Sequence, residues 1–185
     1  MGFRGRQMKK KAIKKLITLN QIKAKEPCSD EWEKLLEYSD KIGRKMDDEF
    51  EITDIIKSNS IRESLWALRV LKGFDKEKRL FDCDCAMLVI DVFEKEYPKD
   101  KRPRIAIETS RRFANDEVTV NELNTAKTAI NIDCLGYAYW AAMAANSATS
   151  ITPNKGALTA WNAALACRGC NYSQIQKLFL KHFKN

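Results

Sequence analysis

Residues 79–114, RLFDCDCAMLVIDVFEKEYPKDKRPRIAIETSRRFA, carry the pattern that decides the fold. In the first half, apolar side chains recur at three- and four-residue steps, which is the period of an α-helix. These side chains are Phe81, Cys85, Leu88, Val89, Val92 and Phe93. Because the stripe is wide, we expect a central helix whose two phenylalanines lie in the core.

A break follows this helix at Tyr97, because the residue before a proline is disfavoured in the helical conformation. Pro103 fits the first turn of a second helix, where its missing N–H has no intrahelical acceptor. Ala106 and Ser110 place small side chains on one side of that helix, which permits close approach of a neighbour. The stretch therefore predicts two packed helices, over about 75–97 and 103–114.

Composition supports helices throughout the chain. The protein has 185 residues, of which 44% are hydrophobic and 31% charged, with only seven glycines and four prolines. This length corresponds to one domain with a substantial core. No segment alternates apolar and polar residues for long enough to predict a sheet. We expect an all-α fold, a compact multi-helix bundle of about seven or eight helices.

Capping signals place several helix starts. Ser60 with Glu63, and Thr119 with Glu122, have the spacing of capping boxes, in which each side chain bonds an unpaired N–H of the first turn. Further expected caps, helices and core positions are an N-cap at Ser29, an N-cap at Asp75, helices over 119–148 and 153–168, and a buried Trp66.

The excess positive charge lies at the N-terminus. The net charge is +8, and residues 1–26 hold nine basic side chains and one acid, whereas residues 27–185 are balanced. The sequence therefore predicts a basic arm (residues 1–26) and a single all-helical domain (residues 27–185). The candidate binding residues of the arm are Arg4, Arg6, Lys9, Lys10, Lys11, Lys14 and Lys15.

Two interpretations of the basic arm stay open. Its cations could bind nucleic acid or another acidic surface. Alternatively, its apolar residues, such as Ile13, Leu16 and Ile17, form one side of an amphipathic helix that docks on the body.

A second basic cluster lies near the hinge. Its candidate binding residues are Arg102, Arg104, Arg111 and Arg112. They could hold a phosphate near the helix N-terminus. The spacing of Glu108 from Arg104 and Arg112 instead favours ion pairs within the helix. A further cation in an apolar run, Arg69, is predicted to be partly buried and paired with a carboxylate such as Asp82 or Asp91.

No arrangement of residues indicates catalysis, a metal or a cofactor. Cys167 and Cys170 have metal-ligand spacing, but a structural zinc site needs a second pair of ligands. Cys83 and Cys85 would point to different sides of one helix. The single histidine, His182, lies close to the C-terminus, a poor position for a catalytic base. We therefore expect a protein that is not an enzyme.

The sequence also bears on location. Its apolar runs are far shorter than the roughly 18 residues of a membrane-spanning helix, and no apolar segment follows the basic N-terminus as in a secretory signal. Six irregularly spaced cysteines do not suggest a secreted disulfide framework, so we expect a reducing, cytoplasmic compartment.

Three stretches carry a resemblance to a known family. They are ITDIIKSNSIRESLWALRVLKGFDKEKRLF, CAMLVIDVFEKEYPKDKRPRIAIETSRRFANDEVT and AYWAAMAANSA. Over about residues 27–148, the chain resembles the small helical, Ala/Trp-rich proteins of bacteria and phages that form the putative immunity protein family. The third stretch departs from the family, because its Ala- and aromatic-rich repeat is short.

The resemblance implies that the protein neutralises a toxin or a defence factor by binding it. The leading interpretation is a phage or mobile-element protein that masks a protein partner, for example a CRISPR nuclease, another defence nuclease or a toxin. Two alternatives remain: nucleic-acid binding through the basic arm, and a pocket that sequesters a signalling nucleotide.

Overall fold

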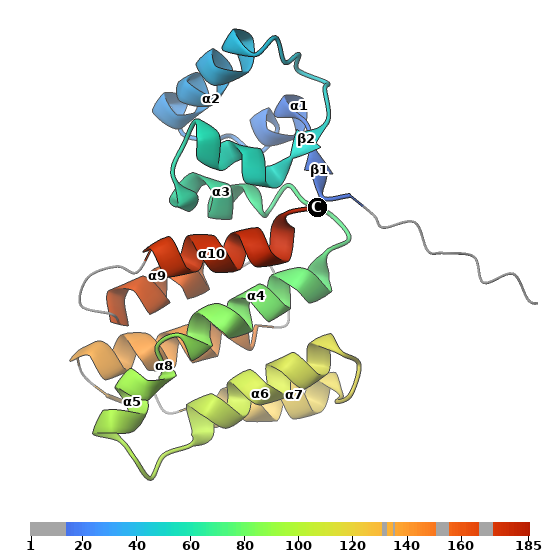
Figure 1. Ribbon diagram of the computed structural model, residues 1–185. Helices are drawn as coiled ribbons and strands as arrows, with labels where there is room; N and C mark the ends of the chain where they lie inside the picture. Colours follow the sequence, from blue (N-terminus) through green and yellow to red (C-terminus); the bar gives the residue numbers. More distant parts are fainter. Residues whose placement is uncertain (1–13, 131–132, 135, 151–155, 167–171) are drawn as a thin grey trace, which may run out of the picture.

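The computed structural model describes residues 14–130, 133–134, 136–150, 156–166 and 172–185. Within these ranges the chain forms ten α-helices, a 3₁₀ helix and a two-stranded antiparallel sheet (Figure 1). The elements are β1 (Leu16–Ile17), α1 (Leu19–Lys23), α2 (Ser29–Lys41), β2 (Phe50–Glu51), η1 (Ile52–Lys57), α3 (Ile61–Ala67), α4 (Asp75–Met87), α5 (Ile90–Glu96), α6 (Arg102–Ala114), α7 (Val120–Thr128), α8 (Gly136–Ala148), α9 (Gly156–Ala166) and α10 (Tyr172–Phe183). The predicted all-α class is confirmed.

Several local predictions are confirmed. Ser60 and Thr119 cap α3 and α7, and the partner glutamates Glu63 and Glu122 complete both capping boxes. Pro103 lies in the first turn of α6. These signals act within four residues of sequence, so their outcome does not depend on distant parts of the chain.

Two predicted helices are divided, which explains why the structure has more helices than expected. The predicted central helix breaks at Leu88–Val89 into α4 and α5. The predicted helix over 119–148 becomes α7 and α8. Gly136, the first residue of α8, has a φ of +63°, which a residue inside a right-handed helix cannot adopt.

The predicted helix starts at Ser29 and Asp75 have different caps from those expected. Cys28 and Phe74 occupy the N-cap positions, and neither makes a side-chain capping bond. Both predicted caps instead lie in the first turn of their helices. There an acid such as Asp75 still interacts favourably with the helix dipole.

Residues 14–26 pack into the body. Leu16 and Ile17 pair with Glu51 and Phe50 in the small sheet, which corrects the expectation of no strands. The backbone N–H of Lys15 also donates to the side chain of Asn185, 2.8 Å away, so the C-terminus lies beside β1 (Figure 1). Ile17, Leu19 and Ile22 are buried, so this part of the chain docks on the body as in the second interpretation of the arm. The amphipathic helix expected there is wrong for Leu16 and Ile17, which form a strand.

Two hydrophobic clusters form the core. One joins α1, α2, η1 and α3 to α10, and the other joins α5, α6 and α8. Helix α4 contributes to both: Phe81 and Cys85 lie in the first cluster, and Cys83 and Ala86 in the second. Phe81 and Phe93 are fully buried, as predicted. Trp66 is only partly buried, because α3 lies at the edge of the first cluster.

Helix α9 completes the frame by packing along α8. The buried face of α8 consists of alanines, including Ala138, Ala141 and Ala145, and Ala163 and Ala166 of α9 belong to the same hydrophobic cluster. Small side chains at such a contact shorten the distance between helix axes. The alanine face of α9 is therefore turned inward, and Leu158 and Trp161 of the same helix remain exposed.

Candidate functional site: a tryptophan groove

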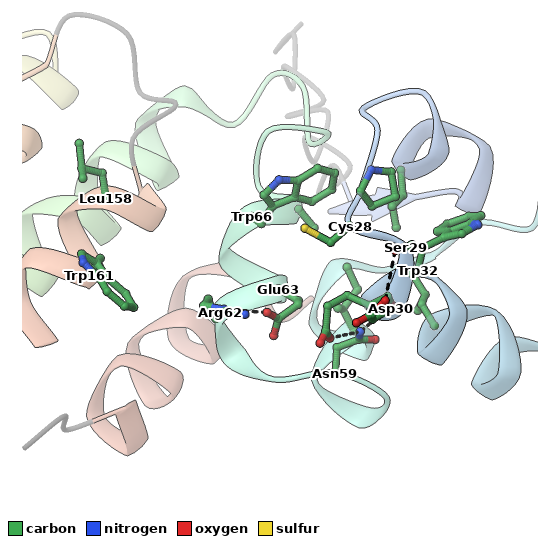
Figure 2. A pocket seen from close by; sticks show the side chains of 16 residues that line it. Cys28, Ser29, Asp30, Trp32, Asn59, Arg62, Glu63, Trp66, Leu158 and Trp161 are labelled. Carbon is green, nitrogen blue, oxygen red and sulfur yellow. Dashed lines mark hydrogen bonds and ion pairs between the residues drawn. The ribbon is translucent and has the colours of Figure 1, made fainter.

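A groove of about 770 Å³ opens between α2, α3 and α9; we call it the tryptophan groove (Figure 2). It is lined by Ile22, Pro27, Cys28, Ser29, Asp30, Glu31, Trp32, Leu35, Ile55, Asn59, Arg62, Glu63, Trp66, Ala67, Leu158 and Trp161. Three of the four tryptophans of the chain are in this set.

The helices that frame the groove place its tryptophans on one surface. Trp32 lies in the first turn of α2. On α3, Trp66 follows Glu63 by three residues, so the side chains of Trp66 and Glu63 share a helix face. Leu158 and Trp161 have the same spacing on α9. In the view of Figure 2, Trp66 lies between Trp32 and Trp161.

The floor of the groove is apolar and the α9 side is open. Ile22, Leu35, Ile55 and Ala67 are buried beneath the lining side chains. By contrast, Trp161 is 44% exposed and Leu158 is 43% exposed. Large apolar side chains grouped at an open groove are typical of binding surfaces.

Polar bonds fix the α2 side of the groove. The Asn59 side chain donates from Nδ2 to the backbone oxygen of Glu31, 2.8 Å away, and to its carboxylate, 2.9 Å away. The same carboxylate accepts from Lys34 Nζ at 2.7 Å. These bonds tie the start of α2 to the turn before α3, so the two walls are held together.

The groove lining carries more negative than positive charge. Among the described residues, its charged side chains are Asp30, Glu31, Glu63 and Arg62, a net charge of −2 on a protein of +8. The hydrogen bond from Lys34 lowers the pKa of the Glu31 carboxyl. Burial raises the pKa of Glu63, but bonds from Ser60 and Arg62 outweigh it and leave that pKa below its ordinary value. Both carboxyls are therefore ionised at neutral pH.

The described residues of the groove lining include no pairing of a nucleophile with a base. Cys28 supplies an exposed thiol. The single histidine of the chain, His182, instead bonds Asp84 at 2.8 Å, away from the lining residues. The arrangement is suited to binding an apolar surface with neighbouring positive charge.

The predicted arm residues fall into two groups. Arg4, Arg6, Lys9, Lys10 and Lys11 lie outside the described residues. Lys14 is exposed beside β1, and Lys15 is partly buried, with its Nζ 5.8 Å from the ring centre of Phe74.

The predicted arginines of α6 all form ion pairs. Arg102 bonds Asp100 at 2.6 Å, Arg104 bonds Glu94 at 2.7 Å and Asp91 at 3.0 Å, Arg111 bonds Asp84 at 2.7 Å, and Arg112 lies 3.9 Å from Glu117. The partners come from α4, α5 and the flanking loops, whereas Glu108 was the predicted partner of Arg104 and Arg112. None of these arginines lines the tryptophan groove.

The prediction for Arg69 is wrong. Arg69 is exposed, and its guanidinium lies 4.5 Å from the ring centre of Trp66, with a hydrogen bond of 3.0 Å to the Trp66 backbone oxygen. The buried arginine is Arg79, which donates to the Ser150 backbone oxygen at 2.7 Å and lies 4.8 Å from the ring centre of Phe113. Helix periodicity could have indicated Arg79, which lies three residues before Asp82 and four before Cys83 and therefore shares their buried face of α4.

Arg79 belongs to a buried polar cluster between α4, α6 and α9. Asp82 is fully buried, and burial raises the pKa of its carboxyl well above the ordinary value. Lys78 is also buried and donates to the Leu71 backbone oxygen. Ser110 connects the cluster to α8 through a 2.7 Å bond to the Ala148 oxygen.

A second cluster fixes the C-terminal helix. Asp84 accepts from Arg111, from Lys181 at 2.9 Å and from His182 at 2.8 Å. Burial raises the pKa of the Asp84 carboxyl, but the hydrogen bonds from His182, Lys181 and Arg111 outweigh burial and hold that pKa well below its usual range. The cluster joins α10 to α4 and α6.

Within the described ranges, no group of three or more His, Cys, Asp or Glu side chains has the geometry of a metal site. Burial raises the pKa of the Cys83 thiol to about 11, and Cys85 faces the other core cluster. Their predicted separation is confirmed. Cys167 and Cys170 lie outside the described residues. No helix in the described part of the chain is both long enough and apolar enough to span a membrane.

Comparisons with known proteins found a family match for one part of the chain. No curated protein and no solved structure matches it. A family model matches the segment from α4 through α7, which confirms the resemblance to immunity proteins over a shorter stretch than the sequence patterns suggested. The residues of the tryptophan groove lie outside that segment. Residues 76–132 match the family model described as Imm-5 like putative immunity protein.

Proposed function

We propose that this protein is a non-enzymatic immunity protein that binds a protein partner and masks it. The observation that carries the proposal is the tryptophan groove, where Trp161 and Leu158 stand exposed beside an apolar floor. Tryptophan is enriched among the residues that dominate binding energy at protein interfaces. The family match over residues 76–132 gives independent support for an inhibitor of this kind.

The partner in this proposal is a toxin or a host defence effector, such as a CRISPR nuclease. We also propose that the chain comes from a phage or mobile element and acts in the bacterial cytoplasm. Support comes from the immunity-protein description and from the six irregularly spaced cysteines, which suit a reducing compartment.

The charge of the groove argues against the sequestration of a nucleotide there. A nucleotide would bring its phosphates beside Asp30, Glu31 and Glu63, and Arg62 is the single cation among the lining residues that the structure describes. Like charges at this distance oppose binding. A protein surface with apolar and basic side chains meets no such repulsion.

Nucleic-acid binding stays the second candidate, because residues 1–26 hold the whole charge excess. In the described part of the chain, the α6 arginines are already paired with carboxylates. A phosphate would have to displace those partners. The basic arm is therefore the remaining place for this activity.

Affinity capture tests the proposal. The full-length protein is used as bait in lysate of the host cell, beside a Trp161→Ala bait and an Ile105→Ala bait. Ile105 is a matched control, since it is 53% exposed on α6 and does not line the groove.

We expect one protein partner to be captured by the wild-type and Ile105→Ala baits and to be lost or strongly reduced with Trp161→Ala. The captured pair is then tested for inhibition of the partner's activity. Equal capture by all three baits, or capture of nucleic acid without a protein, would contradict masking through the groove.

A further inference from the structure

We infer that the tryptophan groove takes a cationic amphipathic segment of its protein partner, with apolar side chains toward the groove and Lys or Arg at its margin. The inference rests on the proposed function and adds the chemistry of the segment that is recognised. It follows from the distribution of charge around the groove and from a contact that the molecule already makes.

The carboxylates at the groove margin are available to an incoming cation. Asp30 is exposed and, among the described residues, forms no ion pair; its carboxylate accepts only from Ser29 Oγ at 3.1 Å. Glu31 and Glu63 are paired with Lys34 and Arg62, whose side chains are 55% and 67% exposed. Pairs with such exposed cations are weak, so a partner's Lys or Arg can replace them or add to them.

The tryptophans suit the same ligand. Indole rings attract cations over their faces and also bury apolar area. Trp66 already shows this chemistry, because the guanidinium of Arg69 lies 4.5 Å from its ring centre. Trp161 is half exposed on the opposite wall and offers an equivalent ring to a partner.

Charge complementarity also selects against other occupants. The described residues of the lining carry a net charge of −2, although the whole protein carries +8. A ligand attracted only by the overall charge would be acidic. If the protein prefers a basic ligand, that preference must therefore come from the local charge of the groove and not from the net charge of the protein.

The test uses two synthetic amphipathic peptides of about 14 residues, four turns if helical. They share one face of Leu and Trp, and the remaining positions are Lys in one peptide and Glu in the other. Binding to the full-length chain is measured by titration calorimetry at low and high salt. Alkylation of Cys28, followed by peptide mass spectrometry, reports whether the groove is covered, because this exposed thiol is part of the lining.

We expect the Lys peptide to bind at least about tenfold more tightly than the Glu peptide and to slow the alkylation of Cys28. Trp161→Ala should weaken the Lys peptide by about 30-fold, as for a central interface tryptophan. Asp30→Lys should weaken it by about three- to tenfold. Glu108→Lys, the same change of charge on the exposed face of α6, should have no effect.

Equal affinity for both peptides would overturn the inference. It would also be overturned if Trp161→Ala left the affinity for the Lys peptide unchanged, or if the bound Lys peptide did not slow the alkylation of Cys28. The two proposals fail differently. A captured partner that needs Trp161 but is indifferent to Asp30→Lys retains the masking function and refutes the cationic segment. A Lys peptide that binds as expected, with a partner whose capture does not change in Trp161→Ala, refutes masking through the groove but retains the groove's preference for a cationic amphipathic segment.

Discussion

Replacement of Phe81 by alanine should destabilise the protein more than any exposed substitution. Phe81 is fully buried on α4, where its ring makes edge contacts with Phe179 and Phe183 of α10, at centroid distances of 6.3 and 5.6 Å. The His182 ring lies 6.1 Å away on a third side. The truncation would therefore leave a cavity between the two helices, lined by rings that have lost their partner.

Truncation of a buried phenylalanine to alanine costs about 3–5 kcal/mol of unfolding free energy. The two edge contacts place Phe81 in the upper half of this range, at about 4–5 kcal/mol. For a chain of this size the loss corresponds to a fall in thermal midpoint of roughly 8–20 °C. Far-UV circular dichroism on heating, with urea unfolding for the free energy, measures both quantities.

Matched variants make this test specific. Ile105→Ala removes an apolar side chain that is 53% exposed and should change the midpoint little. Phe93→Ala perturbs the other core cluster, so the unfolding free energy that it removes should add to the amount removed by Phe81→Ala in the double variant. A midpoint for Phe81→Ala within about 2 °C of wild type would refute the packing of α10 on α4.

Four further outcomes are expected. The ionised Asp84 carboxyl has a lowered pKa, so it contributes stability that is present above about pH 4 and lost as the pH falls toward that pKa. Asp84→Asn should therefore lower the unfolding free energy by about 1–2 kcal/mol at pH 7. It should also make the unfolding free energy, measured with urea, fall less between neutral and acid pH. Cys28 should react with a thiol reagent much faster than Cys83, whose pKa is about 11, as measured by alkylation and peptide mass spectrometry. Deletion of residues 1–13 should slow association with a protein partner more than it speeds dissociation, as measured by binding kinetics at two salt concentrations. Abolished binding with a steep salt dependence would instead support nucleic acid. Elemental analysis should find no stoichiometric zinc, and a chelator should leave the helicity unchanged.

The proposed deletion stops at residue 13 because β1 begins at Leu16 and α1 follows it. A deletion through residue 25 would also remove Ile17, Leu19 and Ile22 from the core. The resulting loss of function would then report unfolding rather than the loss of a binding arm. The shorter deletion keeps β1 and α1 in place.

The sequence by itself determined the helical class and the start of several helices. Ser60 with Glu63 and Thr119 with Glu122 cap their helices as predicted, because a capping box involves four consecutive residues. The periodicity around Phe81 likewise identified buried positions on α4. Signals of this kind depend on local geometry and survive any arrangement of the helices.

Tertiary packing decided what these local signals could not. Arg69 lies on the surface and Arg79 inside, because the buried polar partners of Arg79, Ser110 of α6 and Ser150 after α8, are more than 30 residues away in sequence. Trp32, Trp66 and Trp161 come from three helices, and nothing in their spacing predicts a shared groove. Close packing of the alanine faces of α8 and α9 leaves Trp161 facing outward, toward α3. The candidate site therefore depends on how the helices meet, which local sequence patterns do not specify.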